Sequence, residues 1–287
     1  MAVYDQAYRS YTGPTTPPRW RFLILPRYAF QEVFRSKLFT ALFALSFAPI
    51  FAFTVWIYLH HNLSALALLK IDPKILPAVN APFFALVMAW QCFSFGFVLT
   101  LLAGPGLVSA DLANNGLPLY LSRPFSRTEY VLGKMSVLVM LLSVLTWIPG
   151  LFLFFLQGYL EGARWLAANL RIAGAIFLGA AMWILPLTLF TLAISAHVKR
   201  KPVAQALLLG LGVGGAALGG AISTIFHTKL GFLLNMPIVM KVLWSGLYGV
   251  DLAPEIPPAG AWASVLGISA VSLFLLARRL KAYEVVR

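Results

Sequence analysis

The segment 109–134, SADLANNGLPLYLSRPFSRTEYVLGK, carries the polar side chains best placed for specific contacts. It lies between two long apolar runs and is far longer than the few residues that a simple turn between two helices requires. Its charged residues are Asp111, Arg123, Arg127, Glu129 and Lys134. The two arginines can each bind a carboxylate through two parallel hydrogen bonds. We interpret the segment as a docking surface for a partner protein.

The first half of this segment predicts a short helix on the membrane surface, over residues 109–124. Asp111 and Asn115 are four residues apart, which places them on one face of such a helix, where they can cap or pair with partner groups. Gly116 and Pro118 are expected to end it.

The second half predicts an apolar anchor with a basic rim. Leu119 and Leu121 are expected to insert into a groove of the partner, and Tyr120 supplies a ring and a hydroxyl at the rim. Arg123 and Arg127 either bridge partner carboxylates or hold anionic lipid headgroups. The sequence leaves these two readings of the arginines open.

The same segment resembles the cytoplasmic loop of permease subunits in the type-2 class of ATP-binding-cassette (ABC) transporters. In that family an acidic residue precedes a glycine, and a leucine-rich patch, a Pro-x-Ser-Arg and a Gly-Lys follow before the next membrane helix. The matching positions are Asp111, Gly116, 119–121, Arg123-Pro124, Ser126-Arg127 and Gly133-Lys134. Leu117 departs from the family, because many members have threonine there, and Asp111 stands where glutamate is commoner.

The resemblance implies a permease that is half of an ATP-driven exporter in the bacterial inner membrane. It implies a homodimer, or a heterodimer with a paralogous permease, that binds two copies of a cytoplasmic ABC ATPase. ATP and Mg²⁺ are expected in that ATPase, and no cofactor or catalytic residue is expected in this chain. The resemblance also implies short re-entrant helices before the last span, and a dimer seam near the first and fifth spans.

Composition independently indicates an all-α polytopic membrane protein. Of 287 residues, 60% are hydrophobic and 11% are charged, whereas soluble domains carry about 25% charged residues. The single Cys92 permits no internal disulfide bond. The net charge of +13 would suggest nucleic acid in a soluble protein, but membrane topology accounts for it below.

Six apolar runs are long enough to cross about 30 Å of hydrocarbon: 38–59, 81–103, 135–157, 170–196, 203–226 and 261–277. We expect Pro149-Gly150 to kink or end the third run and Pro186 to interrupt the fourth. The chain then divides into a cytoplasmic N-terminus, 1–37, and one membrane domain, 38–287, with a coupling loop at 104–134. Residues 227–260 have no clean run, which favours short re-entrant or interfacial helices.

The N-terminal part predicts a basic amphipathic helix over 19–37, lying along the lipid bilayer. Arg27, Gln31 and Arg35 recur every four residues after Pro26, a favourable first helical residue.

Basic residues indicate that both termini are cytoplasmic. Sixteen Lys and Arg fall in the segments then placed inside and six in those placed outside, and Lys and Arg gather on the cytoplasmic side of membrane proteins. This distribution accounts for the basic charge without nucleic acid.

The apolar runs hold no Asp, Glu, Lys or His well inside them, which argues against an ion-coupled transporter. There is no phosphate-binding loop and no zinc-like set of ligands. A transporter of this composition therefore takes its energy from a separate ATPase chain. The alternative is a non-transporting membrane anchor or assembly subunit that docks a cytoplasmic partner, and a membrane enzyme lacks a catalytic constellation.

The fifth run contains small residues four apart: Gly210 with Gly214, and Gly215 with Gly219. Such pairs let helix backbones approach closely. They pack either within the chain or across a dimer.

Overall fold

The computed structural model describes Gly13 and residues 24–70, 72, 76–116, 126–250 and 256–281. Every regular element in these ranges is helical. Six helices are long and apolar enough to cross a membrane: Lys37–His60, Ala81–Ala113, Arg127–Glu161, Leu170–His197, Lys201–Ile225 and Pro258–Leu280. This agrees with the prediction of an all-α polytopic membrane protein, and these helices are called the first to sixth spans.

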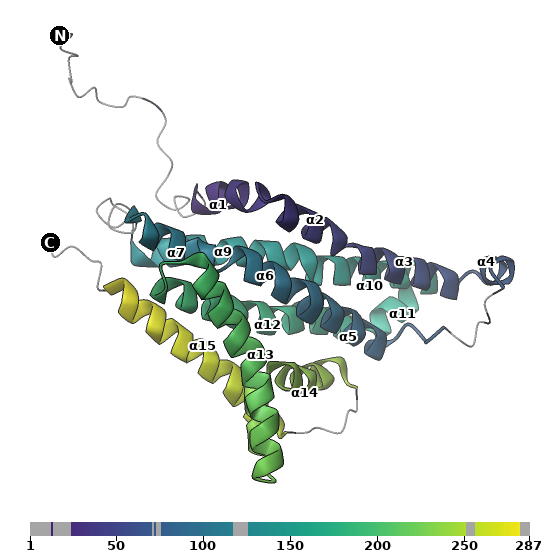
Figure 1. The fold of residues 1–287 in the computed structure, drawn as a ribbon. Helices are drawn as coiled ribbons and strands as arrows, with labels where there is room; N and C mark the ends of the chain where they lie inside the picture. The colour runs from purple at the N-terminus through teal and green to yellow at the C-terminus, as the bar shows by residue number, and fades with distance from the viewer. Residues whose placement is uncertain are drawn as a thin grey trace, which may run out of the picture.

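The first three spans are each built from consecutive helical segments. The first is α2 (Lys37–Leu45) and α3 (Ala48–His60), preceded by α1 (Ile24–Phe34). The second is α5 (Ala81–Ala89), the π-helical η3 (Trp90–Gly96), α6 (Phe97–Ala103) and α7 (Gly106–Ala113). The third is α9 (Arg127–Leu145) and α10 (Trp147–Glu161). Two short helices, α4 (Leu63–Leu68) and α11 (Ala163–Ala168), lie at the end of the molecule opposite α1 and α7 (Figure 1).

The fourth span, α12 (Leu170–His197), is the centre of the bundle. It packs against α7, α9, α10, α14 (Met236–Tyr248) and α15 (Pro258–Lys281). The fifth span, α13 (Lys201–Ile225), is the least buried of the six and runs away from the others toward its C-terminal end (Figure 1). Its contacts are chiefly with the 3₁₀ segment η4 (Lys229–Leu234).

The two prolines expected to disturb spans behave differently. The third span breaks at Thr146, where φ is −108° and ψ is −84°, because Pro149 has no N–H to donate to the carbonyl of Leu145. The predicted kink is therefore confirmed. The predicted interruption at Pro186 is wrong, since α12 is continuous through it. Pro186 is buried, and the packing of α12 against neighbouring helices on several sides holds the helix together there.

Short helices do precede the last span. With 13 residues, α14 is about 20 Å long, too short to cross the hydrocarbon. Gly249 ends it in the left-handed region at φ 69°. Arg171 of α12 then binds two of its free carbonyls, donating from Nε to Leu247 O at 2.9 Å and from Nη2 to Gly246 O at 2.7 Å.

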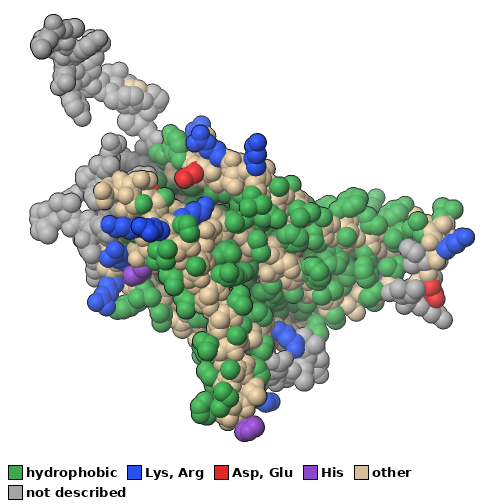
Figure 2. Space-filling model, in the orientation of Figure 1, with side chains coloured by type: hydrophobic (Ala, Val, Ile, Leu, Met, Phe, Trp, Pro, Cys, Tyr) green, Lys and Arg blue, Asp and Glu red, His purple; other side chains and the backbone are tan. Residues whose placement is uncertain are grey.

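The amphipathic helix of the N-terminal part is α1, which ends at Phe34, before the expected end at 37, while residues 19–23 lie outside the described residues. Arg27 and Gln31 are exposed, while Pro26 and Ala29 are buried where α1 packs against α9 and α2. In the view of Figure 2, Lys and Arg side chains gather over α1 and at the end of the bundle that holds α7, and apolar side chains cover the middle.

Candidate functional site

The structure describes both ends of the predicted docking segment. Asp111, Asn115, Gly116 and Arg127 are placed, whereas the anchor residues Leu119, Tyr120 and Leu121, together with Arg123, lie outside the described residues.

The predicted surface helix over 109–124 is wrong for its first part, residues 109–113, and its residues 117–124 lie outside the described residues. The helix there is α7, which begins at Gly106 and ends at Ala113, directly beyond the turn at Gly104-Pro105. Its residues Leu107, Val108, Ser109 and Leu112 are buried, because α7 packs against α12 and α13. It is thus the end of the second span and belongs to the bundle.

Asp111 and Asn115 do not share a helical face. Asn115 lies beyond the end of α7 with φ at 52°, a left-handed conformation that asparagine tolerates and that commonly follows a helix end. Asn115 is exposed, and Gly116 and Asp111 are half-buried.

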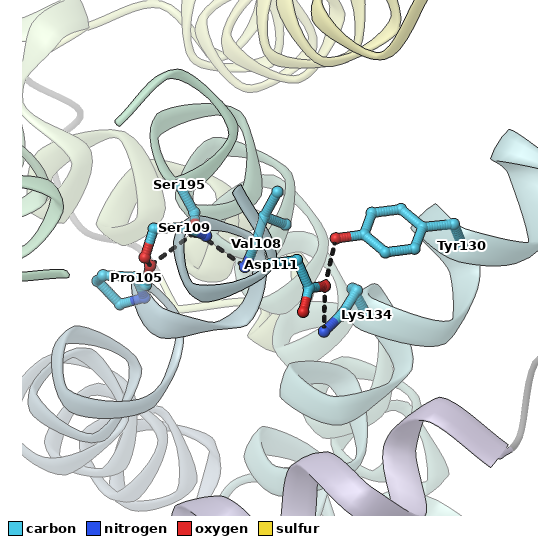
Figure 3. A network of polar contacts seen from close by, with 7 residues as sticks. All are labelled: Pro105, Val108, Ser109, Asp111, Tyr130, Lys134 and Ser195. Carbon is cyan, nitrogen blue, oxygen red and sulfur yellow. Dashed lines mark hydrogen bonds and ion pairs between the residues drawn. The ribbon is translucent and has the colours of Figure 1, made fainter. Parts of the chain in front are cut away.

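The Asp111 carboxylate is engaged within the chain. Its Oδ2 accepts a hydrogen bond from the Tyr130 hydroxyl at 2.7 Å and lies 2.8 Å from the Lys134 ammonium (Figure 3). Tyr130 and Lys134 reach the same oxygen because they are four residues apart on α9. The Asp111 and Lys134 side chains are only 17% and 10% exposed, so the pair is well shielded from water and joins α7 firmly to α9.

A second set of hydrogen bonds joins α7 to α12. The Ser195 hydroxyl accepts from the backbone N–H groups of Val108 at 3.1 Å and Ser109 at 3.0 Å, and it donates to the carbonyl of Pro105 at 2.7 Å (Figure 3). The first N–H groups of a helix have no partner inside it. Ser195 accepts hydrogen bonds from two of these N–H groups of α7. It does what an N-cap side chain does, but from a neighbouring helix.

Arg127 is the first residue of α9 and is half-buried. Ser126 before it forms a capping box with Glu129: the Ser126 N–H donates to Glu129 Oε2 at 2.6 Å and the Glu129 N–H donates to Ser126 Oγ at 3.1 Å. This box sets where the third span begins.

Sequence reasoning selected Asp111 and the Gly133-Lys134 motif but missed Tyr130 and Ser195. The spacing of Tyr130 and Lys134, one helical turn apart at the start of an apolar run, was a usable signal. The sequence holds no comparable signal for Ser195, since a single hydroxyl in an apolar helix usually donates to a backbone carbonyl of the same helix.

The geometry of the site is that of an attachment between helices. Its carboxylate is held by a cation and a phenol, and no group of three His, Cys, Asp or Glu within the described ranges is placed to hold a metal ion. What the site does is fix the neighbouring ends of the second, third and fourth spans to one another.

Four of the six glycines of α13, the ones selected from the sequence, fall into two groups. A Cβ on Gly219 would collide with the backbone carbonyl of Gly231 in η4, and one on Gly215 would lie 3.5 Å from the carbonyl of Leu234. At Gly210 and Gly214, no described residue beyond the adjoining part of α13 lies within 4 Å of that position. Gly219 therefore allows a close approach inside the chain, and Gly210 and Gly214 lie on an open face.

Comparisons with protein-family models and with curated proteins found no match to this chain.

Replacing Ser195 by alanine tests the contact between α7 and α12. Loss of a helix cap costs about 1 kcal/mol, so we expect S195A to lower the free energy of unfolding by about that amount and to raise hydrogen exchange at Val108 and Ser109. The matched control is Ser136→Ala, because the Ser136 hydroxyl donates only to Gly133 of its own helix. Equal effects of the two variants would contradict the capping role.

Proposed function

We propose that this chain is the membrane-spanning permease subunit of an ATP-driven ABC transporter of the type-2 class. The observation that carries the proposal is the double attachment of α7, to α9 through Asp111 and to α12 through Ser195. In a transporter of this class, movement of the partner has to reach the membrane spans through the docking loop. This loop begins at α7 and ends at α9, and the Asp111–Lys134 ion pair fixes these two helices to each other.

Coupling would then work as a rigid lever. Residues 114–126 connect the end of α7 to the start of α9, so a partner that binds this connection pulls on both helices. Because Ser195 holds α7 against α12, the fourth span follows. In this proposal Asp111 holds α7 to α9 and does not contact the partner, because its Oδ2 is engaged by Tyr130 and Lys134. The proposed partner contacts are Tyr120, Leu121, Arg123 and Arg127.

The orientation proposed is with both termini cytoplasmic, in the inner membrane. Basic residues near α1, at the start of α13 and at the end of α15 support it, and Figure 2 shows Lys and Arg gathered toward that end of the molecule. The short η4 and α14 would then lie on the outer side as re-entrant helices. A second copy, or a paralogous permease, would pack on the open face of α13.

The energy source would be a separate ATPase with bound ATP and Mg²⁺, present in two copies. An apolar cavity of about 350 Å³ supports an amphiphilic cargo. It lies among η3, α12, α13 and α15, has no charged residue in its lining, and includes Phe93, Trp183, Phe190, Leu211 and Ile268. The export direction rests on the resemblance of segment 109–134.

The test is a double replacement in the proposed anchor, Tyr120→Asp with Leu121→Asp. Charged carboxylates cannot enter an apolar groove without a large desolvation cost, so we expect co-purification of the partner ATPase to fall about tenfold or more. The matched control is Tyr159→Asp, which makes the same change at an exposed tyrosine near the opposite end of the third span. Full retention of the ATPase and of transport by the double variant would rule out the coupling role.

The alternative, a non-transporting anchor that docks the same partner, predicts the same loss of co-purification. Reconstituted vesicles distinguish the two functions. A transporter subunit shows ATP hydrolysis that depends on its cargo, and an anchor does not.

A further inference from the structure

A cavity of about 390 Å³ lies between α1 and the adjoining ends of α6, α7, α9 and α13. It touches the site described above, because Asp111 and Lys134 form part of its wall. Those two charges are already paired with each other, so they contribute little net charge to the cavity.

The two other charged residues of the lining are Glu32 from α1 and Lys201 from α13. Both are exposed, and in the ranges that the structure describes neither forms an ion pair. The stem of Lys201 passes Gly106, with its Cδ 3.4 Å from where a Cβ would stand. A cation and an anion thus face one cavity from opposite helices, and each is open to a ligand.

Apart from Tyr28 and Ser36, the rest of the wall is apolar, and part of it comes from the first two spans. Leu25 and Leu107 line the cavity near the charges, and Phe39 and Leu102 line it from the first and second spans. Next to Phe39, Leu38 is 62% exposed on the outer surface of the first span. A ligand that fits has a headgroup with both charges and an apolar tail, which describes a phospholipid.

We propose that this cavity binds the headgroup of a zwitterionic aminophospholipid, with its phosphate on Lys201 and its primary ammonium on Glu32. The acyl chains would follow Phe39 and Leu102 onto the surface of the first two spans. An anionic phospholipid would satisfy Lys201 but leave Glu32 facing a negative headgroup. A choline headgroup carries no N–H to donate to the carboxylate. This proposal does not depend on the transport function, only on the first two spans lying in a bilayer.

The experiment is a competition in which the purified full chain is given equal amounts of dioleoyl phosphatidylethanolamine, phosphatidylcholine and phosphatidylglycerol. Lipids retained in detergent are counted by native mass spectrometry. We expect about tenfold preference for phosphatidylethanolamine over the other two. An absence of that preference, or a preference for phosphatidylglycerol, would overturn the proposal.

Three variants locate the preference. Glu32→Gln is expected to abolish the preference over phosphatidylcholine, and Lys201→Gln to reduce retention of all three lipids. Glu32→Lys places two cations at the cavity and is expected to switch the preference to phosphatidylglycerol. The matched control is Lys199→Gln, which removes a cation from the same turn but not from the cavity lining. Unchanged selectivity in Glu32→Gln and Glu32→Lys, with both variants folded, would refute the site.

Discussion

Lys134→Met is expected to lower the free energy of unfolding by about 3 kcal/mol, the lower end of the range for breaking a buried ion pair. The variant leaves the Asp111 carboxylate, only 17% exposed, without its cation. One hydrogen bond, from Tyr130, remains to it. The lower end of the range applies because the pair retains some contact with water. Chemical unfolding in detergent measures the loss.

The control for this prediction removes both charges. Asp111→Asn combined with Lys134→Met leaves no unpaired charge, so the double variant should recover most of the loss. It should still couple poorly to the ATPase, because α7 and α9 are no longer held by charge. If the double variant is as unstable as Lys134→Met alone, the ion pair is not the cause of the instability.

Gly219→Leu is expected to have a comparable effect, by a different mechanism. The first carbon of the new side chain meets the backbone carbonyl of Gly231, which cannot rotate away as a side chain does. Overpacking of this kind costs about 1–3 kcal/mol and occasionally more, and here it forces η4 away from α13. We expect a large fall in the midpoint of thermal unfolding of the protomer.

Gly214→Leu is the matched variant, on the same helix but on its open face. Since no described residue beyond the adjoining part of α13 lies within 4 Å of the added carbon, the protomer should unfold at its normal temperature. Light scattering then reports on contact between chains: loss of dimer in this variant supports packing through the open face of α13. We assign Gly219 to a contact inside the chain and Gly214 to the open face. A lower unfolding midpoint in Gly214→Leu, or an unchanged midpoint in Gly219→Leu, would contradict this assignment.

The sequence by itself determined the spans and their approximate limits. An apolar run of about 20 residues forms a helix in lipid because every backbone group must be hydrogen-bonded within the segment, and this property is local. The break near Pro149 is also predictable from the sequence, because the missing N–H of proline disturbs a helix whatever surrounds it. The prediction that 227–260 holds no full crossing followed from the lack of an uninterrupted apolar run of about 18 residues, and the described helix there, α14, has only 13 residues.

Only the tertiary structure decided which residues meet. Asp111 and Lys134 are both visible in the sequence, but their pairing depends on how α7 lies against α9, and Ser195 reaches α7 only because α12 is the central helix. Residues 109–113 do not lie on the surface as predicted, because Leu107 and Leu112 bring α7 against the bundle. Pro186 stays helical for a similar reason, and Gly219 differs from Gly214 only in what lies opposite it. Such choices depend on contacts between distant segments, which the local pattern of residues does not encode.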